Sequence, residues 1–268
     1  MAHEIDYEIK GSEMQFVEIE LDPEEAAIAE AGSMMFKDAS VEMDSVFGDG
    51  SEEERGTGIF GRLVGAGKRL ITGESLFTTV FANTGSAKAK VAFAAPYPGR
   101  ILAVPLSEVG GAIVCQKDAF LCAARGVSVG LHFQRRILTG LFGGEGFIMQ
   151  RLEGDGWCFI HVGGTLAERE LQPGEELHVD TGCLAAMTPT VDMDIERVGG
   201  IKSMIFGGEG VFFARLTGPG KVWLQSLPFS RLAGRMLAAA PPQSSKGEGR
   251  KGEGSALGSL GDMLSGDR

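Results

Sequence analysis

The sequence predicts an all-β fold, and three observations support this prediction. The 268 residues include 41 glycines but only 7% aromatic residues, a composition that suits many tight turns between short strands. Apolar and acidic residues alternate with a period of two in residues 191–196, as they do in a half-buried strand. The third observation is one segment pattern that occurs three times along the chain.

The repetition is clearest in the second half of the chain. GGEGFIMQRLEGDGWCF, residues 143–159, aligns with GGEGVFFARLTGPGKVW, residues 207–223, at an offset of 64. Near the start, EIELDPEEAAIAEAGSMMF, residues 18–36, aligns with ERELQPGEELHVDTGCLAA, residues 168–186, at an offset of 150. An insertion of 15 residues within 47–70 then lowers that second offset to 135. The sequence thus predicts three tandem repeats, over about 5–95, 96–164 and 165–228.

Each repeat is expected to form a small β-sandwich or roll. The segments LEGDG and LTGPG predict hairpin turns, because Gly beside Asp or Pro is typical of turns. Val127, Val129, Leu131 and Phe133 are expected to share one face of a strand. WCFIHV, residues 157–162, is apolar on both faces and should lie between two layers. The three units either stack or group around a pseudo-threefold axis, so that their edges cover one another.

The glycine-rich segments raise the alternative of a phosphate-binding loop. They occur three times, at residues 72–75, 143–146 and 207–210. A tight turn is needed once in every structural unit, and glycine supplies the positive φ that such a turn demands. We therefore interpret these segments as turns of the architecture.

Helical patterns are confined to two short segments. Residues 61–70 predict a short helix inside the insertion, and residues 229–240 predict a short amphipathic helix with Phe229, Leu232 and Met236 on one face. Residues 241–268 are rich in Gly, Ser and charged residues, a composition that predicts a disordered low-complexity tail.

Charge is distributed unevenly along the chain. The formal net charge is −11, whereas residues 1–54 alone carry −15, which leaves about +4 for the remainder. An acidic total argues against general nucleic-acid binding, and the asymmetry could steer one copy toward another. No stretch without Asp, Glu, Lys or Arg exceeds 13 residues, so no spanning helix is expected. The four cysteines lack CxxC spacing and are interpreted as buried apolar residues in a reducing compartment.

Six segments of the chain resemble a known family. The segments LITGESLFTTVF, PGRI, DAFLCAARGV, GGEGFIMQRLEGDG, GEELHVDTG and GPGKVWLQS occur in the order typical of bacterial members of the altered-inheritance-of-mitochondria protein family. The resemblance covers about residues 5–228. It implies an all-β fold of the double-stranded β-helix type, similar to the tryptophan RNA-binding attenuation protein superfamily, and a role in organising the mitochondrial inner membrane for fungal relatives. It implies no catalytic residues.

The sequence motifs that suggest catalysis or cofactor binding are incomplete. GAGKRL around Lys68 fails the nucleotide-loop consensus, because Arg62 replaces the first glycine and Arg69 follows the lysine. No serine or cysteine lies in a GxSxG turn. The four histidines show no metal-binding spacing, and Cys158 and His161 should point to opposite faces of one strand. We therefore expect no catalytic residue, no cofactor and no metal.

The only candidate site residues are the glutamates that recur in the three turns: Glu74, Glu145 and Glu209. On a threefold body they would form a ring of carboxylates that binds a cation or a basic partner. In the simpler interpretation each glutamate caps backbone amides within its own turn.

These observations predict a non-enzymatic β-scaffold that self-associates as a homo-oligomer and binds a protein partner. We expect a cytoplasmic protein, and the helix at 229–240 leaves open peripheral contact with the inner membrane. The alternative is a small-ligand-binding protein or an unrecognised enzyme with a pocket between repeats. RNA binding rests on fold analogy alone and conflicts with the acidic charge.

Overall fold

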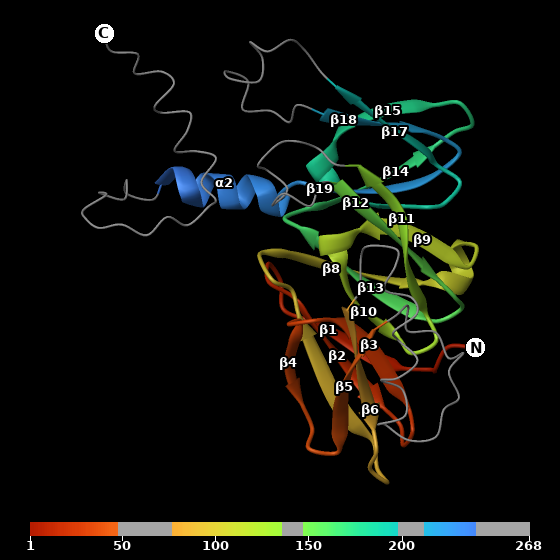
Figure 1. Ribbon diagram of the computed structural model, residues 1–268, viewed down its shortest axis with the longest axis vertical. Helices are drawn as coiled ribbons and strands as arrows, with labels where there is room; N and C mark the ends of the chain where they lie inside the picture. Colours follow the sequence, from red (N-terminus) through yellow and green to blue (C-terminus); the bar gives the residue numbers. More distant parts are fainter. Residues whose placement is uncertain (48–76, 136–146, 198–211, 240–268) are drawn as a thin grey trace.

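The structure, a computed structural model, describes residues 1–47, 77–135, 147–197 and 212–239 (Figure 1). These residues are nearly all β, and the one α-helix among them is α2 (Phe229–Ala239). The prediction of an all-β chain with little helix is therefore confirmed. Single 3₁₀ turns form at Leu106–Val109, Lys117–Ala119 and Thr181–Cys183. The expected helix at 61–70 and the tail at 241–268 lie outside the described residues.

The strands form four antiparallel sheets, which we number 1 to 4. Sheet 1 has the order β1 (Asp6–Lys10), β2 (Phe16–Leu21), β7 (Ala89–Ala94), β4 (Met34–Lys37). Sheet 2 has the order β5 (Val41–Phe47), β6 (Phe77–Asn83), β3 (Ala26–Glu30), β10 (Phe120–Ala124), β13 (Trp157–Gly163), β8 (Gly99–Pro105). Sheet 3 has the order β11 (Ser128–Arg135), β12 (Phe147–Glu153), β9 (Ala112–Gln116), β16 (Leu184–Met187), β19 (Gly220–Gln225), β14 (Leu166–Leu171). Sheet 4 has the order β15 (Glu176–Asp180), β18 (Phe212–Thr217), β17 (Asp192–Arg197).

Two half-sheets recur in this topology. The orders β2-β7-β4, β8-β13-β10 and β14-β19-β16 use strands from equivalent places along the chain. The orders β5-β6-β3, β11-β12-β9 and β17-β18-β15 do the same. Sheets 2 and 3 each combine one half of either kind, whereas sheets 1 and 4 contain only one.

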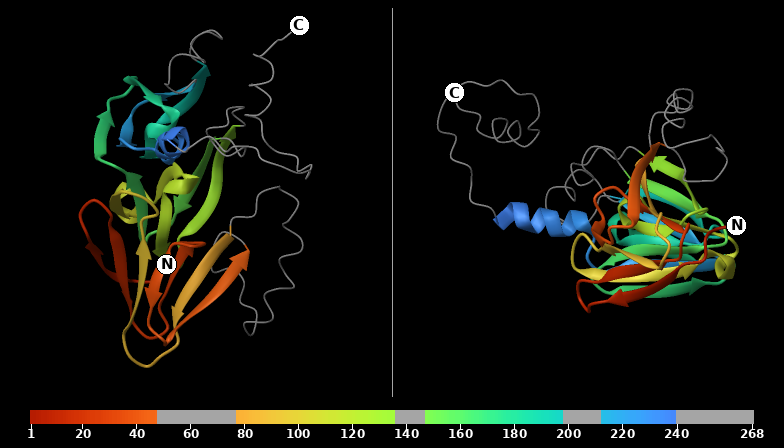
Figure 2. Two further views of the ribbon diagram at one scale, coloured as in Figure 1. Left: turned by 90° about the vertical axis from the view of Figure 1, so that its left-hand side faces the viewer. Right: turned by 90° about the horizontal axis from the view of Figure 1, so that it is seen from below.

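A hydrophobic core fills the space between each pair of consecutive sheets. Ile19 and Phe93 of sheet 1 pack with Phe159 of sheet 2, and Ile160 of sheet 2 packs with Leu152 of sheet 3. β13 thus places neighbouring side chains in two different cores, which confirms the prediction for WCFIHV. The third core, between sheets 3 and 4, contains Phe147, Leu184, Leu216 and Val222. Sheet 1 and strands β5 and β6 of sheet 2 lie toward the lower end of the long axis, β8, β13 and sheet 3 lie near the middle, and sheet 4 lies at the upper end (Figures 1 and 2).

The predicted periodicity holds in β17 and fails at the end of β11. Val191 and Ile195 are buried, whereas Asp192 and Asp194 between them are exposed. Leu131, expected inside, is 50% exposed. A register shift between Leu131 and Phe133 in the β11–β12 ladder interrupts the alternation of faces, and such irregularities redirect side chains.

Two of the predicted glycine turns, at LEGDG and LTGPG, form where the sequence indicates. Gly154 between β12 and β13 has φ +150°, and Gly220 at the start of β19 has φ +147°. A Cβ at Gly220 would also press on Thr190 and Val191 at 2.5 Å and 2.8 Å. Both positions therefore favour glycine for reasons of architecture.

Candidate interaction surfaces

The three recurring glutamates are the candidate site residues that the sequence singled out. Glu74, Glu145 and Glu209 lie outside the described residues. Each belongs to the connection of one antiparallel pair: β5–β6, β11–β12 or β17–β18. These three pairs of strands hold the same place in sheets 2, 3 and 4.

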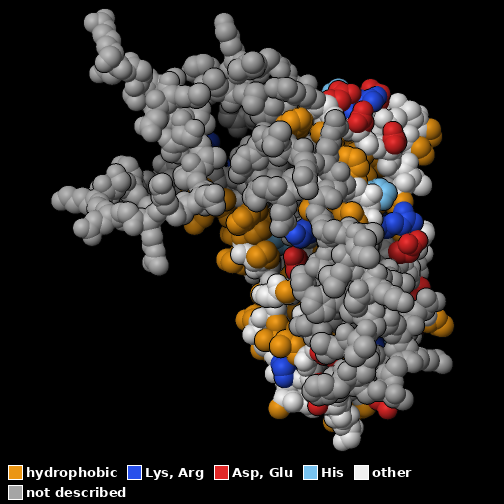
Figure 3. All heavy atoms as spheres, in the orientation of Figure 1, with side chains coloured by type: hydrophobic (Ala, Val, Ile, Leu, Met, Phe, Trp, Pro, Cys, Tyr) orange, Lys and Arg blue, Asp and Glu red, His pale blue; other side chains and the backbone are white. Residues whose placement is uncertain are grey.

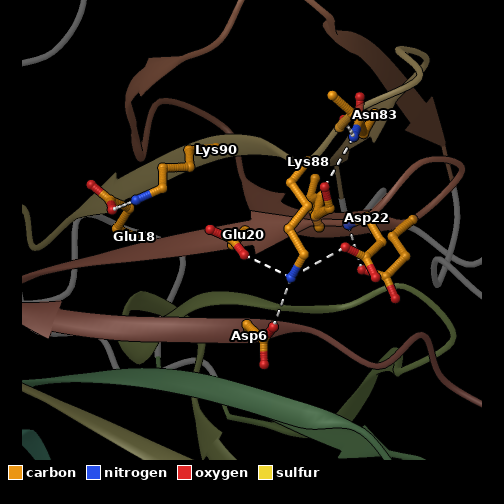
Figure 4. A network of polar contacts seen from close by, with 10 residues as sticks. Asp6, Glu18, Glu20, Asp22, Asn83, Lys88 and Lys90 are labelled. Atoms are coloured by element: carbon orange, nitrogen blue, oxygen red, sulfur yellow. Dashed lines mark hydrogen bonds and ion pairs between the residues drawn. The ribbon is translucent and has the colours of Figure 1, made fainter.

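The outer face of sheet 1 is covered by ion pairs (Figure 4). Lys90 Nζ lies 2.6 Å from Glu18 Oε1, and Lys88 Nζ lies 2.8 Å from Glu20 Oε1 and 3.4 Å from Asp6 Oδ2. The hydrogen bonds from Lys90 and then from Lys10 hold the pKa of Glu18 below its ordinary value. Because both lysines and Asp6 are exposed to solvent, the pairs favour hydration of this face and add little stability.

The outer face of sheet 4 carries an acidic cluster around one arginine. Arg215 on β18 pairs with Glu196 at 2.7 Å, Glu176 at 3.2 Å and Asp194 at 3.6 Å. One cation among these carboxylates leaves an excess of negative charge. This face therefore suits water or a basic surface.

Edge strand β4 presents large apolar side chains to solvent. Met34, Met35 and Phe36 are 38%, 55% and 37% exposed, and we call these three residues the β4 patch. Figure 3 shows hydrophobic side chains gathered along the edge of the molecule that carries β4 and β8. An apolar cluster on an unpaired edge is typical of an interaction surface.

Helix α2 projects from the body and exposes an apolar face (Figures 1 and 2). Phe229, Met236 and Leu237 are 54%, 67% and 74% exposed. At 100° per residue they share one side of the helix, while Arg231 and Arg235 lie on the opposite side. The helix contains no acidic residue. The sequence predicted this amphipathic segment, and the structure adds that its apolar face has no cover among the described residues.

The base of α2 is fixed to the body. The Phe229 ring lies 5.5 Å from the Tyr97 ring, between centroids, and burial raises the pKa of Tyr97 to about 12. Arg231 lies 3.6 Å from Asp180 Oδ2, and its guanidinium donates to the Ser226 carbonyl at 3.5 Å. Asp180 in turn accepts a hydrogen bond from the Gly182 amide at 2.8 Å. The helix therefore leaves the body in a defined direction.

His161 lies buried beneath this attachment. Its ring packs edge-on against Tyr97, with centroids 4.4 Å apart, and it is 1% exposed. Neither ring nitrogen makes a hydrogen bond of good geometry, although the nearby Tyr97 backbone slightly favours the charged form. Burial dominates and lowers the pKa of His161 to about 4, so the imidazole is neutral near pH 7. Cys158, by contrast, packs in the core between sheets 2 and 3, as expected for opposite faces.

Sequence reasoning missed a second buried titratable group, Glu30 at the end of β3. Burial, and then the charge of Asp118, raise the pKa of Glu30 to about 7, and Lys117 partly opposes this effect. The charge of Glu30 also contributes to the raised pKa of buried Cys115 on sheet 3. The only available signal was an acidic residue directly after the apolar run Ala26–Ala29.

Two grooves of about 360 Å³ each flank the turn at 188–190. Phe133 and Met193 border the first, and Arg151, Glu170 and Lys221 border the second. Among the described residues, no cluster of three or more His, Cys, Asp or Glu side chains is placed to hold a metal ion. In the same ranges, no helix has both the length and the hydropathy needed to cross a bilayer.

Comparison with known proteins places the chain in a family. The sequence model of the mitochondrial biogenesis AIM24 family matches residues 7–227. An uncharacterised protein of Streptococcus pyogenes serotype M6 is 30% identical over 236 residues, which are 86% of this chain and 90% of that protein. A crystal structure of a S. pyogenes protein from a structural genomics consortium superposes with a TM-score of 0.68 at 25% identity, over 88% of this chain and 99% of the other. The chain belongs to the AIM24 family, as its resemblance indicated.

Proposed function

We propose that this AIM24-family chain is a non-enzymatic β-scaffold that self-associates and binds a protein partner at the inner face of a membrane. The observation that carries the proposal is the concentration of exposed large apolar side chains on two elements, β4 and α2. The faces of sheets 1 and 4 are instead covered by charged groups. Apolar patches within a charged surface mark contact sites.

The body of this scaffold is three tandem copies of one sandwich, related to the double-stranded β-helix. The recurring half-sheets support this idea, because their strands follow the sequence offsets. Leu166, the first residue of β14, lies 150 positions after Phe16 of β2, and Leu184 of β16 lies 64 positions after Phe120 of β10. A body of this kind offers rigid, repeated elements for assembly and is well suited to a scaffold.

Helix α2 is the element that contacts the membrane. Its apolar face with two arginines and no acidic residue matches the composition of helices that lie in the plane of an anionic bilayer surface. The attachment through Tyr97 and Arg231 holds the helix away from the body, where a flat surface can reach its exposed side chains.

Two measurements on the full chain test this function. Sedimentation velocity at micromolar concentration should show species larger than a monomer. Flotation with vesicles of phosphatidylcholine plus phosphatidylglycerol should recover the chain, and Phe229→Ser with Met236→Ser should abolish recovery. Leu131→Ser is the matched control, because Leu131 is an exposed apolar residue on β11. A monomeric chain that does not bind anionic vesicles would refute the proposed scaffold function.

A second candidate function is small-ligand binding in the groove beside Arg151 and Lys221. Its volume of about 360 Å³ lies within the range of small-molecule sites, and two cationic side chains, Arg151 and Lys221, and two carboxylates, Glu108 and Glu170, border it. Native mass spectrometry of the purified chain would reveal a retained polar metabolite. A mass equal to that of the chain alone, together with unchanged thermal stability across a panel of metabolites, would count against this candidate.

A further inference from the structure

We propose that copies of the chain join head to tail, with β4 of one protomer pairing antiparallel with β15 of the next. This inference rests on the proposed self-association and specifies its geometry. The interface would join sheets 4 and 1 into one seven-stranded sheet across two chains, with the order β17-β18-β15-β4-β7-β2-β1.

The pattern is set by the two complete sheets. In sheet 2 the half-sheets meet where β3 pairs with β10, and in sheet 3 they meet where β9 pairs with β16. Both contacts are antiparallel. In each case an edge strand of one kind of half-sheet (β3 or β9) pairs with an edge strand of the other kind (β10 or β16).

The two end sheets each lack the half that the other possesses. Sheet 1 contains β2-β7-β4, and among the described strands nothing pairs with the outer edge of β4, whereas β1 covers the opposite edge of the sheet. Sheet 4 contains β17-β18-β15, and no described strand pairs with the outer edge of β15. The two sheets lie at opposite ends of the long axis, so β4 and β15 of one chain do not meet (Figure 1).

The burial of equivalent strands supports this completion. Cys122 and Ala123 on β10 and Ala186 and Met187 on β16 are 0–1% exposed, because those strands have neighbours on both edges. β4 has the same position in its half-sheet, yet the β4 patch remains exposed. An unpaired edge with apolar side chains is a template for another strand. On β15, Val179 is already buried and the outer edge of the backbone is free to pair.

The register can be derived from either internal contact. In sheet 3, Ala186 pairs with Cys115. Phe36 corresponds to Ala186 at the offset of 150, and Val179 corresponds to Cys115 at the offset of 64. In sheet 2, Cys122 pairs with Ala29. The same offsets again relate this pair to Phe36 and Val179. Both contacts therefore predict Phe36 opposite Val179 and Lys37 opposite His178.

An interface between two different surfaces of the same chain is not self-limiting by itself. Repeated, it produces either a closed ring or an open filament, depending on the rotation between successive copies. A ring would give one discrete size, and a filament would give sizes that increase with concentration. Either result agrees with pairing of β4 with β15.

Disulfide trapping tests the register. One chain carries Phe36→Cys and a second chain carries Val179→Cys, both on a Cys183→Ser background because Cys183 is the one native cysteine that is not fully buried. Opposed residues of an antiparallel pair lie about 4.5–5.5 Å apart between Cα atoms, which a disulfide can span. Mild oxidation of the mixture should give a dimer that contains one chain of each kind. Phe36→Cys mixed with Leu177→Cys, two residues out of register, should give much less.

Loss of the edge gives an independent readout. Phe36→Lys should raise the dissociation constant of the assembly about 10- to 100-fold, since burial of one large apolar side chain contributes about 1.5–3 kcal/mol. Leu131→Lys is the matched control, and circular dichroism verifies that both variants fold. A wild-type assembly that forms no Phe36–Val179 crosslink and tolerates Phe36→Lys would overturn this pairing while leaving self-association intact. A monomeric wild-type chain would overturn both.

Discussion

Glu30 should make the stability of the chain fall as the pH rises from about 4.5 to about 7. Its pKa is raised from the ordinary value of 4.5 to about 7, first because the carboxyl is buried and second because Asp118 is near. The folded state therefore binds the proton of Glu30 more tightly than the unfolded state does. This contribution to stability is fully present below pH 4.5 and is lost by about pH 7.

The magnitude follows from the two pKa values. One pKa unit corresponds to about 1.4 kcal/mol, so the difference between 4.5 and about 7 sets an upper bound of about 3 kcal/mol. Partial solvent access at the end of β3 should reduce this figure. We expect Glu30→Gln, whose amide mimics the protonated carboxyl, to stabilise the chain by about 1–3 kcal/mol at pH 8 and by nearly nothing at pH 4.

Urea unfolding at pH 4, 6 and 8 measures this effect as the difference between variant and wild type. Comparison at equal pH removes the contributions of other titrating groups, including His161. Glu42→Gln on β5 is the control, because Glu42 is exposed. If Glu30→Gln gave the same difference at pH 4 and pH 8, or destabilised the chain at pH 8, the argument from burial would be wrong.

Three further predictions concern the attachment of α2 and its surroundings. His161, whose pKa is lowered to about 4, stabilises the fold above about pH 6.5, and that contribution should be lost as the pH falls through 4. His161→Phe should reduce this loss of stability at low pH, measured by urea unfolding. Gly99→Ala should destabilise the chain by about 3 kcal/mol in thermal unfolding, because the new Cβ would meet the Val162 carbonyl and lie 2.6 Å from His161 Nε2. Gly234→Ala is the contrasting variant: it has open space around it and should stabilise α2 by about 0.5–1 kcal/mol. Tyr97→Ala should loosen the helix, which would appear as faster amide hydrogen exchange in 229–239; unchanged exchange would show that the Tyr97–Phe229 contact does not hold it.

The elements that could be predicted from sequence are those in which local pattern and packing agree. The alternation in β17, the two-faced burial of β13 and the turn at Gly220 all follow from side-chain periodicity or backbone conformation. The exposure of Leu131 could not be predicted, because it depends on a register shift against the neighbouring strand. The buried environment of Glu30 likewise results from strands far apart in sequence, including the segment with Asp118.

The candidate surfaces divide in the same way. The amphipathic pattern of α2 is local and was visible in the sequence, whereas its attachment through Tyr97, Asp180 and Ser226 joins three distant segments. The role of the β4 patch was hidden for another reason. Met34, Met35 and Phe36 align with Leu184, Ala185 and Ala186 and look like ordinary strand residues until the sheet order shows that β4 lies at an edge.

That alignment also bears on how the chains would join. At the internal contacts, small residues such as Ala123 and Ala186 suffice, because the covalent chain already holds the two half-sheets together. A contact between separate chains must in addition offset the loss of translational and rotational freedom, about 4–15 kcal/mol, so it needs more apolar area for each strand. Methionine and aromatic residues are enriched in such interfaces. Phe36 stands where the internal contacts have Cys122 and Ala186, and Met35 stands where they have Leu121 and Ala185, so the larger side chain at position 36 is what an intermolecular version of the same strand pairing requires. We expect the double variant Met35→Ala with Phe36→Ala to keep the fold and to dissociate the assembly into monomers.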